Sequence, residues 1–400
     1  MAAVKMRQQL YRRAFMPTFW GGGFDSPSPM ARLNGRLIRL DLIAATEHDR
    51  QAAEDYALLA RLGLGWSRED VRWHLCEPQP GHYEFSHLEP VVDAAKKHNI
   101  QIVWSWMHYG CPEFTNPLDA SFPDQLAALG VQHLRWLRQH GITDPIVCPI
   151  NEISYYTWHV ETLGNWYPFA LGQGARLKAN LIAGHRRCYE QSKEIVPETR
   201  ILMIDPFYYA VGDARDPATE ESAAFWREAS WEAMDQLAAY SDILGMNFYP
   251  DSQVECYRSP GDKHDARRML PLDDPRRVSL TQALQFYHSR YGSMPVLVAE
   301  TSVRGMRRAP WITRLTDEAI EAIKRDLPLV GICWYPVLDV WDWGYLRHGR
   351  VPNRPRFSRS GLIRIDHTGS GLRRSVSATL LQVLHTQEAR VHSIQQSVSA

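Results

Sequence analysis

Two glutamates in this sequence stand where apolar, strand-like runs end. PIVCPINE at residues 145–152 ends in Asn151 and Glu152, and PVLVAE at residues 295–300 ends in Glu300. A lone carboxylate in such a place is usually a solvated strand end, which is the simpler interpretation of either glutamate by itself. Two carboxylates that face each other can divide proton transfer and nucleophilic attack between them. That chemistry requires a fold that brings the two strand ends together.

Short apolar runs alternate with amphipathic runs along most of the chain, which predicts eight strand-then-helix units. The expected strands are residues 15–24, 65–73, 100–110, 144–152, 200–207, 242–250, 294–301 and 329–339. The expected helices are residues 48–63, 86–99, 123–141, 175–196, 221–241, 280–292, 316–327 and 373–390. Strands that alternate with helices form a parallel sheet, and eight such units match a closed barrel better than an open sheet.

We therefore predict an α/β fold consisting of a single (β/α)8 TIM barrel. The barrel domain is expected at residues 15–390, with an N-terminal extension at 1–14 and a C-terminal tail at 391–400. Strand-to-helix loops are expected around residues 153–174, 250–278 and 343–362. In this fold the loops and the carboxyl ends of the strands form the active face.

The other strand ends supply further candidates. In chain order they are Arg68 in the second strand, His108 at the end of the third, Asn247 and Tyr249 at the end of the sixth, and Trp334, Asp339, Asp342 and Trp343 in and after the eighth. Each has an ordinary role available, such as a hydrogen-bonded core histidine or a salt-bridge arginine.

The pair of glutamates changes this interpretation, because strands 4 and 7 face each other across the mouth of such a barrel. Two carboxyl groups about 5 Å apart are what a retaining glycosidase needs, one as nucleophile and one as proton donor. Arg68 and Tyr249 are placed to keep Glu300 ionised by charge and hydrogen bonding. Glu152, in a drier place, would keep a raised pKa and stay protonated.

These residues resemble glycoside hydrolase family 1, the β-glucosidase-type enzymes of the clan with its acid/base on strand 4 and its nucleophile on strand 7. The matching stretches are REDVRWHLCEP at 68–78, HYGCP at 108–112, NEI at 151–153, MNFYP at 246–250, AETS at 299–302 and WYPVLDVWDW at 334–343. The resemblance implies Glu152 as acid/base, Glu300 as nucleophile and Tyr249 as its partner. It implies that the sugar hydroxyls are bound by Asn151, His108, Asp342 and Trp343, with Asn247 and Trp334 nearby.

The sequence departs from the family around the sugar. GGGFDSPSPM at residues 21–30 stands where the family has a Q-x-E-G segment, so Asp25 is the nearest polar candidate there. The family's Glu before the last Trp is shortened to Asp342, AETS lacks the Asn-Gly, and NEI lacks the Pro. Glucose specificity therefore does not carry over.

The composition limits the kinds of molecule that the protein is expected to bind. Lys plus Arg and Asp plus Glu are 45 each, so no net positive charge favours nucleic acid or an anionic membrane. The N-terminus has no apolar signal region and no window approaches a membrane span. We expect a cytoplasmic enzyme with six reduced cysteines, acting on a small glycoside or oligosaccharide, whose oligomeric state the sequence leaves open. The two carboxylates need no cofactor and no metal.

Several alternatives stay open. The same intermediate supports a transglycosidase, and the altered sugar site is compatible with a catalytically silent glycan-binding barrel. The aromatic residues at 158–169 either line a second sugar subsite or pack their own loop against the protein. The basic run around Arg304 is either a solvated loop or a binding site for an anionic substituent of the substrate. The glycines at 21–23 are expected to make room for backbone under the pocket rather than to bind a dinucleotide.

Overall fold

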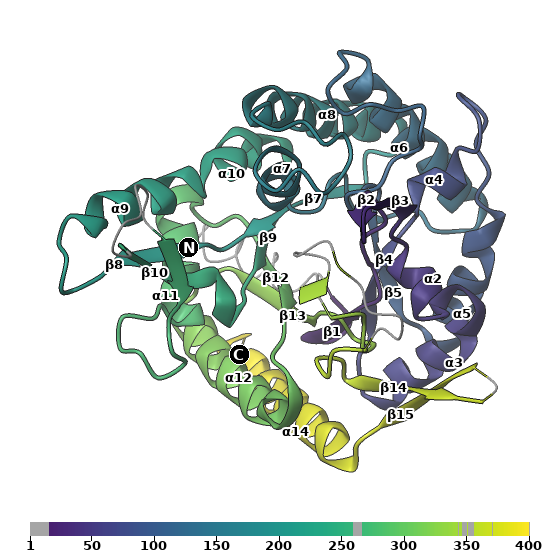
Figure 1. The fold of residues 1–400 in the computed structure, drawn as a ribbon. Helices are drawn as coiled ribbons and strands as arrows, with labels where there is room; N and C mark the ends of the chain where they lie inside the picture. Colours follow the sequence, from purple (N-terminus) through teal and green to yellow (C-terminus); the bar gives the residue numbers. More distant parts are fainter. Residues whose placement is uncertain are drawn as a thin grey trace.

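Eight parallel strands close into a barrel at the centre of the molecule (Figure 1). The computed structural model describes residues 16–258, 266–342, 344–345, 350, 356–369 and 371–399. Around the barrel the strands are β1 (Trp20–Gly23), β13 (Leu329–Trp334), β12 (Val296–Thr301), β9 (Ile243–Asn247), β7 (Arg200–Pro206), β6 (Ile146–Cys148), β5 (Gln101–Ser105) and β4 (Trp66–Asp70). Each overlaps one of the expected strands, so the predicted (β/α)8 barrel is confirmed.

Helices surround the barrel (Figure 1). They are α2 (Leu42–Ala45), α3 (His48–Arg61), α4 (Trp73–Cys76), α5 (Glu89–His98), α6 (Phe122–Gln139), α7 (Ile153–Glu161), α8 (Gly174–Ile195), α9 (Thr219–Ala229), α10 (Glu232–Leu237), α11 (Leu280–Tyr291), α12 (Arg308–Lys324) and α14 (Ala378–Ser399), with short 3-10 turns at Ser86–Leu88, Ala238–Tyr240, Pro250–Ser252 and Gly305–Arg307. The helix expected at 221–241 is two helices, α9 and α10, separated at Ser230. The last helix runs to Ser399, beyond the domain boundary expected at residue 390.

Two of the expected loops contain regular structure. The segment 153–174 begins with α7, whose buried residues Ile153, Tyr156, Thr157 and Val160 follow the helical spacing i, i+3, i+4, i+7. The segment 250–278 contributes β10 (Gln253–Tyr257) and β11 (Ala266–Met269), which form a small sheet with β8 (Tyr209–Gly212). Two hairpins complete the described strands, β2 (Met30–Leu33) with β3 (Arg36–Arg39), and β14 (Ile363–Thr368) with β15 (Gly371–Val376).

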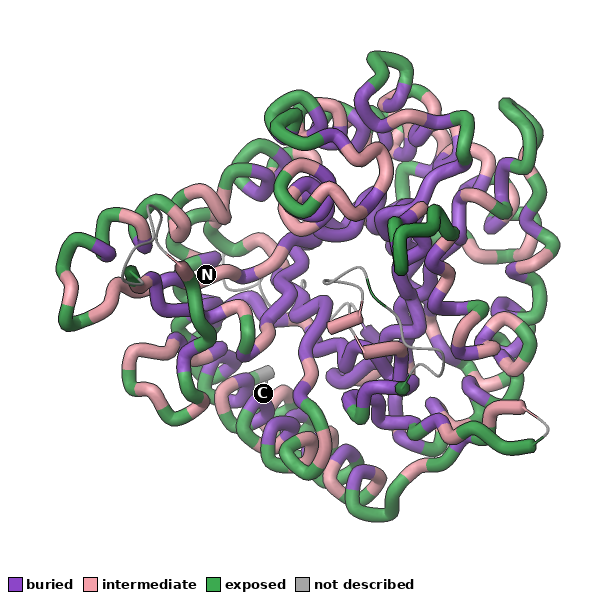
Figure 2. The backbone as a smooth tube through the Cα atoms, in the orientation of Figure 1, coloured by how far each residue is buried: buried purple, intermediate pink, exposed green. Residues whose placement is uncertain are grey.

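Side chains from the strands fill the barrel. In Figure 2 most of the tube around the centre of the molecule is coloured as buried. Trp66 is the largest of these side chains and is fully buried. A Cβ at Gly21 would lie 2.2 Å from the Trp66 indole, so this glycine makes room for a ring of the core. At Gly23 a Cβ would lie 2.9 Å from the Tyr335 ring. The space at these glycines is thus taken by side chains of other strands, not by backbone as we expected.

The N-terminal strand is tied to the C-terminal helix. Glu388 in α14 accepts hydrogen bonds from the backbone N–H groups of Phe19 at 2.7 Å and Trp20 at 3.0 Å. β1 pairs in parallel with β4 and with β13, the first and the last of the other barrel strands along the chain. The pairing of β1 with β13 therefore closes the barrel, and Glu388 adds a contact from the C-terminal helix.

Candidate active site

Glu152 lies between β6 and α7 and turns its side chain into the mouth of the barrel. Its backbone has a φ of 47°, a left-handed conformation uncommon for residues other than glycine, and its N–H donates to the Ile204 carbonyl at 3.1 Å. One carboxyl oxygen, Oε1, accepts from Nδ2 of Asn247 at 2.8 Å. The other, Oε2, accepts from the Tyr109 hydroxyl. Neighbouring strands thus fix both the backbone and the carboxyl group of Glu152.

Glu300 lies in β12 and has a different set of partners. Its Oε1 accepts from Nη1 of Arg68 at 2.9 Å, and its Oε2 accepts from the Tyr249 hydroxyl at 2.9 Å. Both Glu300 and Arg68 are buried. A guanidinium on one oxygen and a hydroxyl donor on the other are the partners that stabilise an ionised carboxylate.

Two links show that the glutamates occupy the same site. Asn247, which donates to Glu152, pairs with Glu300 in the register between β9 and β12. Arg68, which binds Glu300, also donates through Nη2 to Oδ1 of Asn151 at 2.8 Å. The barrel therefore brings together the catalytic candidates and the side chains expected to support them.

The two carboxyl groups have unequal electrostatic environments. Burial first, and the nearby charge of Glu300 second, raise the pKa of Glu152 to about 8, against a smaller lowering by the Tyr109 and Asn247 hydrogen bonds. Glu152 is consequently protonated at neutral pH. The arrangement can deliver a proton from one carboxyl group and present the other as a charged oxygen nucleophile.

Asp25 lies behind Arg68 and shares that arginine with Glu300. Its Oδ2 is 2.6 Å from Nη2 of Arg68, and Ser105 donates to the same oxygen at 3.3 Å. Burial acts to raise the pKa of Asp25, but the Arg68 charge and the His108 hydrogen bond outweigh it and lower that pKa. Asp25 is therefore a buried carboxylate whose second oxygen, Oδ1, has no hydrogen-bond partner among the described residues.

Of the remaining candidates, His108 contacts the residues around the two glutamates, whereas Trp334 and Asp342 have other partners. His108 belongs to the central cluster, because its Nε2 lies 3.1 Å from Nδ2 of Asn151. Trp334 is fully buried at the end of β13 and donates its indole N–H to the Ser360 carbonyl at 2.8 Å. Asp342 forms a two-pronged ion pair with Arg304, both oxygens at 3.0 Å from guanidinium nitrogens. Trp343 lies outside the described residues.

Two residues near the site were missed by sequence reasoning. Tyr109 donates to Glu152 and also lies 3.3 Å from Nδ2 of Asn151, although it directly follows the candidate His108. Asp205, at the end of β7, accepts from the Ser154 N–H at 3.0 Å and from its hydroxyl at 2.5 Å. Its position after an apolar strand is the same signal that identified Glu152 and Glu300.

The aromatic loop after α7 packs against the site from outside. Trp166 is fully buried and stacks on His159, with ring centroids 3.7 Å apart, and its ring centroid lies 4.9 Å from that of Tyr109. Of the two open alternatives, loop packing therefore holds for Trp166.

Within the described ranges, no group of three or more His, Cys, Asp or Glu side chains is arranged to hold a metal ion. In the same ranges, no helix has the length and apolar character needed to cross a membrane. The six cysteines all lie in the described ranges, where they are buried and none is part of a disulfide.

Comparisons with known proteins agree with the barrel fold. A family model of glycoside hydrolase family 42, described as beta-galactosidase, matches residues 44–127, a stretch that includes Arg68 and His108. A β-glucosidase from Thermotoga maritima in complex with glucoimidazole superposes with a TM-score of 0.73 at 14% identity, covering 94% of this chain and 98% of that one. The AHE enzyme from Alicyclobacillus herbarius superposes with a TM-score of 0.73 at 16% identity, covering 94% of this chain and 98% of that one.

A further β-glycosidase structure has a TM-score of 0.73 at 18% identity, covering 93% of this chain and 96% of that one. No curated protein sequence matches the chain. The resemblance to barrel glycosidases seen in the sequence is thus confirmed at the level of the fold, over nearly the whole length of both chains.

Proposed function

We propose that this protein is a retaining β-glycosidase that cleaves a small glycoside or oligosaccharide. The observation that carries the proposal is the unequal pair of buried carboxyl groups: Glu152 has a pKa raised to about 8, and Glu300 is bound by Arg68 and Tyr249. A retaining mechanism needs one protonated and one ionised carboxyl group at the same bond. The fold shared with β-glucosidase structures supports this assignment.

In the first step, a Glu300 oxygen attacks the anomeric carbon while Glu152 donates its proton to the leaving oxygen. The bond from the anomeric carbon to the leaving group breaks and an ester bond to Glu300 forms. Arg68 and Tyr249 hold Glu300 charged and oriented before the attack. Once Glu300 is esterified, its negative charge no longer raises the pKa of Glu152, which suits the release of the proton.

In the second step, Glu152 is a carboxylate and removes a proton from a water molecule that attacks the anomeric carbon. The ester bond breaks, Glu300 is restored as a carboxylate and Glu152 regains its proton. Asn247 and Tyr109 both donate to Glu152 and therefore favour the ionised form that this step requires. The two carboxyl groups supply proton and nucleophile, so the scheme uses no cofactor.

The proposed sugar ligands surround this pair. They are Asn151, His108, Asp25 through its unpartnered Oδ1, Asn247, Trp334, Asp342 and Trp343. Thermotoga maritima β-glucosidase has been solved in complex with glucoimidazole and with deoxynojirimycin, which supports a sugar-sized ligand. Because Asp342 pairs with Arg304, we propose that Arg304 orients Asp342 toward the outer hydroxyls rather than binding an anionic substituent.

The test is a panel of 4-nitrophenyl β- and α-glycosides with gluco, galacto, fuco, xylo, arabino and phosphorylated sugars. We expect release of 4-nitrophenol from at least one neutral β-glycoside, and retention of the anomeric configuration in the first product seen by NMR. Inversion at the anomeric carbon would contradict the mechanism. Silence of the whole panel, with no glycosyl-enzyme detectable by mass spectrometry, would favour a silent glycan-binding barrel.

Asp205 is proposed to position Glu152 through the start of α7. Glu152 occupies the N-cap position of that helix but makes no capping hydrogen bond, since its side chain points to Tyr109 and Asn247. Asp205, from the neighbouring strand, accepts from Ser154 instead, two residues after Glu152. Burial raises the pKa of Asp205 to about 6, so it is mostly ionised at pH 7, and its charge contributes to the raised pKa of Glu152.

Asp205→Asn is therefore expected to lower kcat/KM by roughly tenfold to a hundredfold, because a small misplacement of a catalytic group is costly. It should also move the alkaline limb of the pH profile to lower pH, because the pKa of Glu152 falls when a neighbouring negative charge is removed. The matched control is Asp216→Asn, which alters a half-buried turn carboxylate that accepts from the Ala218 N–H. A lower melting temperature with an unmoved alkaline limb would show that Asp205 is only structural.

A further inference from the structure

A second hollow lies outside the barrel mouth, in the layer of helices. It is a cleft of about 540 Å³ between the β7–β8 connection, α9, the start of α10 and α11. In Figure 1 these elements form one side of the molecule, where β8 and α9 extend beyond the barrel. The volume lies in the range of small-molecule sites. No residue of the candidate active site lines the cleft.

Aromatic rings make up much of the cleft. The ring planes of Phe207 and Tyr209 differ by 4° and those of Tyr209 and Phe286 by 14°, with centroids 6.4 and 6.2 Å apart. Phe286 is 41% exposed, so this surface is open to solvent. Aromatic faces of this kind bind the C–H faces of sugars, while nearby polar groups bind the hydroxyls.

Two arginines provide polar groups at the same cleft. The guanidinium of Arg227 lies 5.9 Å from the Tyr209 ring, and that of Arg290 lies 5.4 Å from the Trp231 ring. Each guanidinium is already paired with carboxylates: Arg227 with Glu220 of its own helix, and Arg290 with Asp235 of α10 and Glu228 of α9. Their charges are therefore balanced locally, and a guanidinium has five N–H donors, more than these ion pairs use. This combination suits a neutral, hydroxyl-rich ligand better than a phosphate.

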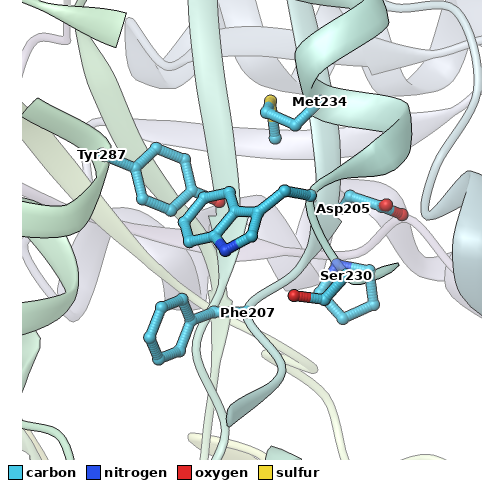
Figure 3. Close-up of a pocket in the computed structure, with 7 residues that line it drawn as sticks. Asp205, Phe207, Ser230, Met234 and Tyr287 are labelled. Carbon is cyan, nitrogen blue, oxygen red and sulfur yellow. The ribbon is translucent and has the colours of Figure 1, made fainter. Parts of the chain in front are cut away.

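The inner wall of the cleft is packed. Behind Phe207 and Trp231 lies a narrow space lined by Asp205, Ser230, Met234 and Tyr287, shown in Figure 3, with no room for a water molecule. The Trp231 ring is held against Tyr287 with centroids 5.1 Å apart. A ligand in the cleft would thus meet a rigid aromatic floor and would be separated from Asp205 and the active site.

We propose that this cleft is a second carbohydrate-binding site, which takes a neutral oligosaccharide and holds it on the outer wall of the barrel. The choice of ligand class rests on the proposed glycosidase function. The inference that the cleft is a binding site depends on its aromatic rings and paired arginines. Its role is to bind a further part of the glycan, or a second glycan, while the mouth carries out hydrolysis.

The experiment measures binding of cellotriose, xylotriose and laminaritriose to the Glu300→Gln protein by isothermal titration, with tryptophan fluorescence as a second signal. An inhibitor selected by its inhibition of wild-type glycoside hydrolysis, with deoxynojirimycin as the first compound tried, is added at saturating concentration to occupy the mouth. We expect one remaining site for at least one trisaccharide, with affinity reduced about fivefold by Phe286→Ala, since an aromatic contact contributes about 1 kcal/mol. Tyr209→Ala is the second variant. Phe225→Ala, which removes a 64% exposed ring of α9 outside the cleft, is the matched control.

Equal binding by Phe286→Ala, Tyr209→Ala and Phe225→Ala, all with unchanged melting temperatures, would overturn the proposal, as would the absence of any binding once the mouth is occupied. Binding of inorganic phosphate in place of the sugars would overturn it too. The glycoside panel distinguishes the failure of this proposal from the failure of the first. Hydrolysis without cleft binding would contradict only the second binding site. Cleft binding without hydrolysis would contradict only the glycosidase function.

Discussion

Glu300→Gln is expected to reduce kcat by about 10⁴-fold or more on every substrate, because the variant retains the shape of the side chain but lacks the nucleophile. Folding should be preserved. The amide oxygen can still accept from Arg68, and Arg68 keeps its ion pair with Asp25. The measurement is a steady-state rate on the best glycoside of the panel, together with mass spectrometry of the protein incubated with a 2-fluoro glycoside, which should label the wild type at Glu300 and leave the variant unlabelled.

The matched control is Glu255→Gln. Glu255 is also a buried glutamate, and it is paired with Arg268 and Arg276 in the small sheet outside the barrel. Its variant should retain normal turnover. Near-normal turnover in Glu300→Gln, or labelling at another carboxylate, would show that Glu300 is not the nucleophile.

Glu152→Ala is expected to lose about 10²–10⁴-fold on glycosides with poor leaving groups and much less on 2,4-dinitrophenyl glycosides, because a good leaving group departs without a proton. The comparison uses the rate of glycosyl-enzyme formation rather than the full cycle, since the second step also needs Glu152 as a base. An equal loss on both classes of leaving group would argue that Glu152 is structural and not the proton donor.

Because the pKa of Glu152 is raised, the rate that depends on its proton should vary with pH. The protonated form is the active acid, so the wild-type rate on poor leaving groups should fall as pH rises through about 8. In Glu152→Ala that alkaline limb should disappear. Tyr109→Phe should move the wild-type limb to higher pH, because the Tyr109 hydrogen bond lowers the pKa of Glu152.

Stability should follow the same titration. The folded-state pKa of about 8 lies above the unfolded value of about 4.3, so ionising Glu152 costs folding free energy. That cost is absent below the unfolded pKa and complete above the folded one. Glu152→Gln should therefore gain melting temperature relative to the wild type at pH 9 and show no such gain at pH 4. A constant difference between the two proteins across this range would contradict the assigned pKa.

The fold was largely predictable because its signals are local. Each barrel strand is a short apolar run between residues that favour turns, and strands alternate with helices along the chain. The carboxylates could be found because strand ends in this fold converge on one face. Helix α7 was missed although its buried residues have helical spacing, because its many aromatics also suit a packed loop.

Arg68 and Tyr249 were predicted as partners of Glu300, and both bind it. Other contacts of the site could not be predicted from the sequence, because they depend on distances between residues far apart in the chain. Asp25 was expected only as a sugar ligand, whereas its ion pair with Arg68 depends on how β1 and β4 lie side by side. The pairing of Arg304 with Asp342 likewise joins two segments that the sequence analysis treated separately. Residue type indicated the chemistry, and packing decided which groups meet.

The closure of the barrel by the pairing of β1 with β13 has a consequence for synthesis on the ribosome. β1 is the first barrel strand to emerge, but one of its two neighbours, β13, emerges after all the other barrel strands, and the Glu388 contact to Phe19 and Trp20 comes later still. Until then the sheet has open edges, which are sites for unwanted pairing. A nascent chain that ends just after Glu300 contains both glutamates and Arg68 but has no closed barrel to hold them, so catalytic competence should appear only after β13 has paired with β1.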